Sequence, residues 1–72
     1  MRYAVVIERD GRDTALTVLD LPGCVAVAET ETEVRRLIDE AVALHVRGLR
    51  EQGENVPAPS TLVDYVDVPT AA

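Results

Sequence analysis

A single amphipathic segment, residues 31–52, divides this 72-residue chain into three β-like runs before it and one after it. Thr30 and Glu33 have the spacing of a capping box that starts a helix, and Gly53 is the type of residue that ends one. Apolar residues recur every three or four positions within the segment, which places them on one side of the helix. Because one helix covers only one face of a sheet, the pattern predicts an α+β domain whose second face needs a partner.

Three short runs rich in β-branched residues precede the helix. They cover residues 2–8, 14–19 and 24–28. Asp10-Gly11 in the first gap and Pro22-Gly23 in the second are turn dipeptides, so both gaps predict tight connections between antiparallel neighbours. The first run is apolar on both parities, which is typical of a central strand with both faces covered.

A fourth β-like run, residues 62–68, follows the helix through a connection in which Pro57 and Pro59 exclude helix. In a β-β-β-α-β order, a right-handed crossover places this last strand beside the first. We therefore predict a four-stranded mixed sheet of order 3-2-1-4 with one helix on one face. Residues 1–69 are expected to form a single domain, and residues 70–72 a disordered tail.

The charge balance excludes several classes of function. Thirteen acidic residues against seven arginines, with no lysine, give a net charge of −6, which argues against a general nucleic-acid binder. Tyr3 and Tyr65 are too few aromatics for a base-stacking platform. No apolar run approaches the ~20 residues of a membrane span, and no signal peptide is visible. With Cys24 as the single cysteine, these features predict a cytoplasmic protein without a membrane contact.

The short chain also has a thin stability margin. Domains below ~70–80 residues rarely obtain more than a few kcal/mol from one core, and often need a disulfide, a metal or a partner subunit. Cys24 cannot form an internal disulfide, and it shares no ligand-pair spacing with His45, so we expect no metal or other cofactor. A homodimer or homotetramer is predicted instead. Small side chains on the sheet face expected to lie away from the helix are the candidate oligomer surface: Ala4, Val6, Ala15, Thr17 and Ala26.

Three motifs, in this order, resemble the HicB-like antitoxin family. They are Leu21-Pro22-Gly23-Cys24, Thr30-x-x-Glu33, and Gly53-Glu54-Asn55-Val56-Pro57-Ala58-Pro59. The resemblance covers residues 3–68 and implies a fold similar to a truncated ribonuclease H. It also implies a non-enzymatic antitoxin that binds a small HicA-type RNA-cleaving toxin and masks its RNA-binding surface. Many members carry a C-terminal DNA-binding segment, whereas this chain ends three residues after Pro69, so no such domain and no direct nucleic-acid binding are expected.

The acidic excess suggests where such a toxin would bind. A HicA-type toxin resembles a double-stranded-RNA-binding domain and is expected to be basic, so an acidic partner would be steered onto its surface. Carboxylates on the loops and the last strand are the candidate toxin contacts: Asp10, Asp13, Asp64 and Asp67. The alternative interpretation of each is an ordinary solvated surface acid.

Two other functions are weighed against the antitoxin. A two-metal nuclease needs several carboxylates converging on metals ~3.5–4 Å apart. A ribonuclease H-like enzyme places the first of them in the middle of its first strand, where this chain has Ala4-Val5-Val6. We therefore predict no catalytic residue, and a small metal-dependent nuclease is disfavoured. An orphan oligomerisation or adaptor domain without a toxin partner stays open as the main alternative.

Overall fold

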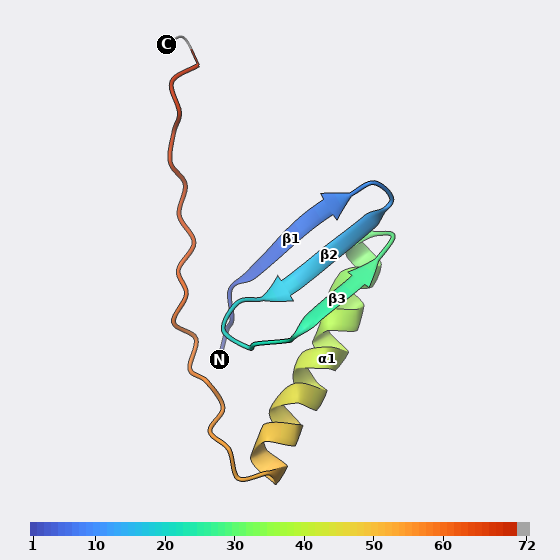
Figure 1. Cartoon of the computed structure of the whole chain (residues 1–72), viewed down its shortest axis with the longest axis vertical. Coiled ribbons are helices and arrows are strands. Elements are labelled where there is room, and N and C mark those ends of the chain that lie inside the picture. Colours follow the sequence, from blue (N-terminus) through green and yellow to red (C-terminus); the bar gives the residue numbers. More distant parts are fainter. Residues whose placement is uncertain (71–72) are drawn as a thin grey trace.

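In the computed structural model, three strands form an antiparallel sheet and one long helix lies across one of its faces (Figure 1). The structure describes residues 1–70. The strands are β1 (Val5–Asp10), β2 (Asp13–Val18) and β3 (Val25–Ala28), and the helix is α1 (Glu31–Glu51). The order β1-β2-β3 places β2 in the centre. The predicted α+β class is confirmed, and so is the antiparallel pairing of the first three strands.

A two-residue turn closes the β1–β2 hairpin. Asp10 pairs with Asp13 across it, and Gly11 has a φ of 62°. Arg12, the second central residue, does not have a positive φ, so the turn corresponds to type II′. The twist of that turn matches the twist of the flanking strands, which is why the Asp-Gly dipeptide predicts this connection.

The Leu-Pro-Gly-Cys motif forms the corner between β2 and β3. Cys24 N–H donates to the Leu21 carbonyl at 3.0 Å, which closes a four-residue turn. Pro22 occupies the second position and Gly23, with a φ of 80°, the third. This is the arrangement of a type II turn, whose third residue must adopt a positive φ. The Cys24 carbonyl in turn accepts from Val18 N–H at 3.0 Å, so the motif fixes how β3 aligns with β2.

The helix begins and ends through local hydrogen bonds that the sequence predicts. Thr30 Oγ1 accepts from Glu33 N–H at 3.1 Å, as in a capping box. Gly53 has a φ of 72°, and Glu54 N–H donates to the Leu49 carbonyl at 2.9 Å. That bond is the long one of a Schellman motif, which supplies partners for carbonyls at the helix C-terminus. The observed helix ends one residue before the predicted end.

The core lies between α1 and the β2–β3 half of the sheet. Its buried members are Leu16, Val18, Leu21, Cys24, Val34 and Ile38. The helix backbone lies closest to β2 and β3, and β1 lies at the margin of the core. Val5 and Ile7 of β1 are therefore only half-buried. The prediction that the first strand is central was wrong: among residues 1–70, β1 pairs only with β2 and is an edge strand.

Residues 62–70, called the arm from here on, run away from the sheet as an extended, unpaired segment (Figure 1). The radius of gyration, 15.0 Å, reflects this, since a compact chain of this length would have about 11 Å. The predicted fourth strand, residues 62–68, is not formed. The order 3-2-1-4 and the ribonuclease H-like frame are therefore not seen in the single chain. Of the predicted tail, residues 71 and 72 lie outside the described residues.

Candidate functional site

Asp20, at the corner between β2 and β3, holds the chain that follows the helix. Its Oδ2 accepts from the N–H groups of Ser60, at 2.9 Å, and Thr61, at 3.0 Å. Its Oδ1 accepts from the Thr61 hydroxyl at 2.6 Å and the Ser60 hydroxyl at 3.3 Å. These bonds, led by that of the Thr61 hydroxyl, lower the pKa of Asp20 from 3.8 to about 2. We call this arrangement the Asp20 clamp.

A second contact holds the same connection further back. The Tyr3 hydroxyl donates to the Pro57 carbonyl at 2.5 Å, which ties the connection to the segment just before β1. The connection is thus attached at two points before the arm starts at Leu62. Within residues 1–70, no hydrogen bond joins the arm to the remainder of the chain.

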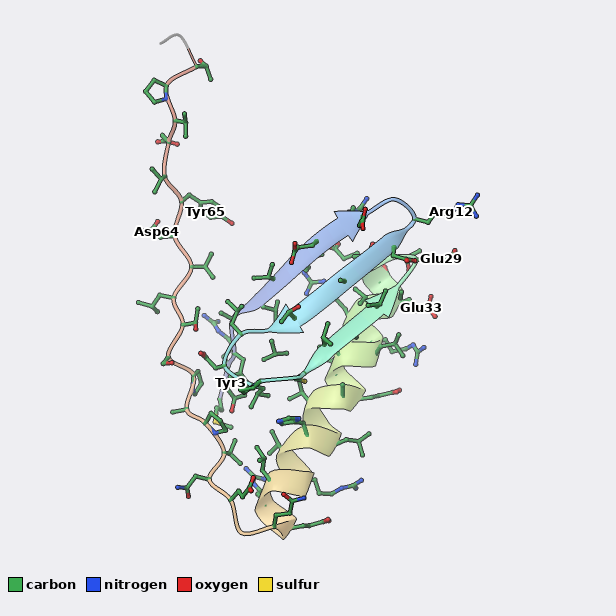
Figure 2. The ribbon with its side chains drawn as sticks, in the orientation of Figure 1. Tyr3, Arg12, Glu29, Glu33, Asp64 and Tyr65 are labelled. Atoms are coloured by element: carbon green, nitrogen blue, oxygen red, sulfur yellow. The ribbon has the colours of Figure 1, made fainter. Side chains whose placement is uncertain are left out.

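The arm carries apolar side chains that are almost fully in water. The exposed fractions are 93% for Leu62, 88% for Tyr65, 89% for Val66 and 77% for Val68. Figure 2 shows Asp64 and Tyr65 projecting from opposite sides of the arm. Exposed apolar side chains at this density, here interrupted by Asp64 and Asp67, are typical of interaction surfaces.

The structure brings two of the four predicted toxin contacts together and separates the other two from them. Asp10 and Asp13 are direct partners across the β1–β2 hairpin. Asp64 and Asp67 lie on the arm, away from the hairpin. Arg12 stands at the tip of the hairpin in Figure 2. The four aspartates therefore form two separate acidic sites rather than one.

Two further acids lie at the hairpin end of the molecule. Figure 2 places Glu29 and Glu33 at this end, beyond β3 and on the first turn of α1. From the sequence, Glu33 was used only as part of the helix cap, and Glu29 was not considered as a contact. The signal that would have found them is register: Ala28 pairs with Thr14, so the residue after β3 lies beside the start of β2. We call Asp10, Asp13, Glu29 and Glu33 together the acidic end.

The face of the sheet away from α1, the outer face, differs from the prediction at one strand. Thr17 pairs with Val6 and Ala15 with Glu8, and these residues alternate with the buried positions of β2. Val6, Ala15 and Thr17 therefore lie on the outer face, as expected. Ala4 precedes β1, and its carbonyl accepts from Leu19 N–H at 3.2 Å.

Ala26 was wrongly placed on the outer face. It pairs with Leu16 and packs against the core, so it faces the helix. Val25 and Val27 occupy the outer face in its place, with exposed fractions of 51% and 55%. The physical reason is the turn before β3, which sets the register and puts the small alanines, rather than the valines, under the helix. A role of the outer face in oligomer contact stays a prediction.

Two hollows lie beside β1. One, of about 250 Å³, lies between the start of the chain, the sheet and α1, and its lining includes Tyr3, Val5, Val18, Ile38 and Val42. The other, of about 460 Å³, opens where the arm leaves the body and is lined by residues including Ala4, Pro59, Thr61, Leu62 and Val63. Both involve the segment just before β1, since Arg2 and Tyr3 line each of them.

Residues 1–70 contain no group of three or more His, Cys, Asp or Glu side chains placed to hold a metal ion. Cys24 is buried in the core, and this burial raises the pKa of its thiol, which keeps it protonated and unreactive.

No helix in the described part of the chain has the length and apolar character to cross a membrane.

The Asp20 clamp predicts a pH dependence. Because the folded pKa of Asp20 lies below its ordinary value, the clamp contributes stability above about pH 4 and loses it as the pH falls through about 2. In an NMR titration, the amide resonances of Ser60 and Thr61 are expected to move with a midpoint near 2. Asp20→Asn removes one oxygen acceptor and should abolish this transition. A midpoint at or above 3.8 for both amides would contradict the clamp.

Comparison with known proteins assigns the chain to a family. A protein of Haemophilus phage HP1 (strain HP1c1), described as an uncharacterized 14.9 kDa protein in the rep-hol intergenic region, is 29% identical over 69 residues. The match covers 96% of this chain and 52% of the phage protein, so the chain spans about half the length of that relative. No solved structure matches. The family model of the HicB-like antitoxin of bacterial toxin-antitoxin systems matches residues 3–71, and this chain belongs to that family.

Proposed function

We propose that this chain is the antitoxin of a toxin–antitoxin pair and neutralises a small, basic HicA-type RNA-cleaving toxin by covering its RNA-binding surface. The observation that carries the proposal is the family match over residues 3–71. A net charge of −6 supports it, because a partner that binds RNA presents a positive surface. In this proposal the chain acts by binding alone, in the cytoplasm, without an enzymatic step, a cofactor or a nucleic-acid contact of its own.

The acidic end is the surface we propose for the first contact with the toxin. Asp10 and Asp13 are exposed and opposite each other on a hairpin whose turn is fixed by Gly11. Glu29 and Glu33 lie at the same end of the molecule (Figure 2). Four carboxylates on a rigid scaffold give an extended negative surface that attracts and orients a basic protein. Asp64 and Asp67 on the arm would add a second acidic contact.

The toxin contact can be tested by making the same change of net charge at two different places on the surface. Asp10→Arg with Asp13→Arg reverses the charge at the hairpin, so that positive side chains face the basic toxin. The dissociation constant of the complex is then expected to rise about 100-fold. Glu51→Arg with Glu54→Arg makes the same change at the far end of α1, where both side chains are exposed, and is the matched control. Calorimetry with the product of a small basic reading frame beside this gene measures both. Equal losses in the two variants would contradict contact at the acidic end.

The proposal includes a homodimer or homotetramer as the active form. It also leaves a second candidate, an oligomerisation or adaptor domain without a toxin, which the exposed apolar arm favours. The calorimetry separates the two, because the second candidate binds no neighbouring basic protein. Growth rescue provides the cellular readout: an antitoxin restores growth of cells that express the toxin, and an adaptor domain does not.

A further inference from the structure

The single chain leaves two complementary features without partners. One is the arm, where Leu62, Tyr65, Val66 and Val68 are each more than three-quarters exposed. The other is the outer edge of β1, which pairs with β2 on one side only. Unpaired edges bind extended segments through main-chain hydrogen bonds, and an apolar extended segment is what such an edge accepts.

The side chains of β1 are less covered than those of the central strand β2. The helix backbone lies closest to β2 and β3, and Val5 and Ile7 of β1 pack at the margin of the core, where they stay half-buried. The hollows of about 250 and 460 Å³ lie at the start of this strand: Val5 lines the first, and Ala4, just before the strand, lines the second. An added strand with large apolar side chains would cover these residues and fill the space. The arm is the extended segment of this chain with that composition.

The arm does not fill this position in its own chain. The Asp20 clamp and the Tyr3–Pro57 hydrogen bond fix the connection up to Thr61, at the same end of the sheet where β1 begins. From Leu62 the arm leaves the body and does not follow β1 (Figure 1). The connection up to Thr61 is thus fixed, and the apolar arm beyond it is exposed and available to bind another molecule.

We propose that the arm of each chain pairs with the outer edge of β1 in a second copy, and that the exchange is reciprocal. The same two surfaces are then used twice about a two-fold axis, which closes the assembly as a dimer and leaves no arm unpaired. Each sheet gains the fourth strand that the sequence predicts, supplied by the partner. The inference specifies the homo-oligomer within the proposed function, and it needs no toxin to be tested.

Main-chain geometry supplies the decisive test. Successive N–H groups of a strand point to opposite edges, and β1 lies on only one side of an arm added at the end of a sheet. Proline removes one N–H and fixes its own φ wherever it stands. Tyr65→Pro and Val66→Pro are therefore controls for each other, because both constrain the arm and only one removes a hydrogen bond to the partner.

The experiment is sedimentation equilibrium of the full chain alone. The wild-type chain is expected at twice its mass of 7.8 kDa. One of the two proline variants should raise the dimer dissociation constant about 100-fold, and the other less than tenfold. Leu62→Asp should also give a monomer, whereas Leu44→Asp, an equivalent change on the exposed part of α1, should leave the dimer intact.

Three outcomes would overturn the proposal. The first is a wild-type chain that is monomeric at about 0.5 mM, where a dimer of ordinary affinity would form. The second is an equal change of the dimer dissociation constant in the two proline variants. The third is an equal change of that constant in Leu62→Asp and Leu44→Asp. Circular dichroism checks folding, which the variants should retain because the arm is outside the core. A dimer that binds no toxin would refute the proposed function alone, whereas a monomer that binds toxin would refute the arm exchange and the homo-oligomer but leave the toxin contact standing.

Discussion

Leu16→Ala is expected to reduce the free energy of unfolding by about 3 kcal/mol. Leu16 is 1% exposed, lies on the central strand between Ile7 and Ala26, and faces the helix. Its removal leaves a cavity at the middle of a core with only six buried members. Because a domain of this size has a margin of only a few kcal/mol, much of the variant should be unfolded at room temperature.

Urea denaturation followed by circular dichroism measures this loss. Protein concentration must be held constant, because dimer formation makes stability depend on it. Leu44→Ala is the matched control: the same atoms are removed from a leucine that is 59% exposed, and the expected change is within about 0.5 kcal/mol. If both variants lost the same free energy, the core would not be where the structure places it.

Gly23→Val is expected to cost roughly 2 kcal/mol, for a different reason. Gly23 has a φ of 80°, which a β-branched residue adopts only with strain. A Cβ at this position would meet no atom within 4 Å, so the cost comes from the backbone rather than from a clash. The strain also displaces the corner that carries Asp20, and so the amides of Ser60 and Thr61 should lose their protection from hydrogen exchange.

Gly48→Ala provides the control, and its effect has the opposite sign. Gly48 lies inside α1, has no positive φ, and has open space where a Cβ would stand. Alanine there should stabilise the chain by about 0.5–1 kcal/mol, because glycine is a poor helix former. If Gly23→Val were neutral in the same denaturation experiment, the corner would be able to relax to another turn type, and its control over the clamp would be refuted.

The features that sequence predicted well are those set by neighbours in the chain. The helix begins at the Thr30–Glu33 cap and ends at Gly53, and the two turns follow from Gly11 and Gly23. Each depends on hydrogen bonds or backbone angles within a few residues. The pairing of the first three strands follows from such turns, because a tight turn leaves antiparallel neighbours little freedom.

Features that join distant parts of the chain were not predicted. The Asp20 clamp links residues 40 and 41 positions apart, and nothing local distinguishes Asp20 from other loop acids. The side of the sheet taken by Ala26 depends on register, and a shift of one residue reverses it. Residues 62–68 were assigned to the sheet of their own chain. A sequence pattern can predict a strand, but it does not show whether that strand pairs within its chain or with a second copy.

Only part of the candidate site was predicted, again because a sequence shows contacts between near neighbours better than contacts between distant residues. Asp10 and Asp13 are close in sequence and meet across one turn, so their proximity could be foreseen. Their distance from Asp64 and Asp67 could not, since it depends on where the arm goes. Glu29 was not among the predicted contacts, although the pairing of β3 with β2 brings it to the hairpin end.

The exposed arm also affects how long the protein survives. Proteases cut extended, solvent-exposed chain far more readily than paired strands. Residues 62–70 are an extended and exposed segment of this kind. Pairing with a second copy would hide these peptide bonds, so the rate of cleavage would follow the fraction of unpaired chains. Dilution would then shorten the lifetime of the protein. Once synthesis slows, its concentration would therefore fall faster than that of a protein whose degradation rate constant does not depend on concentration.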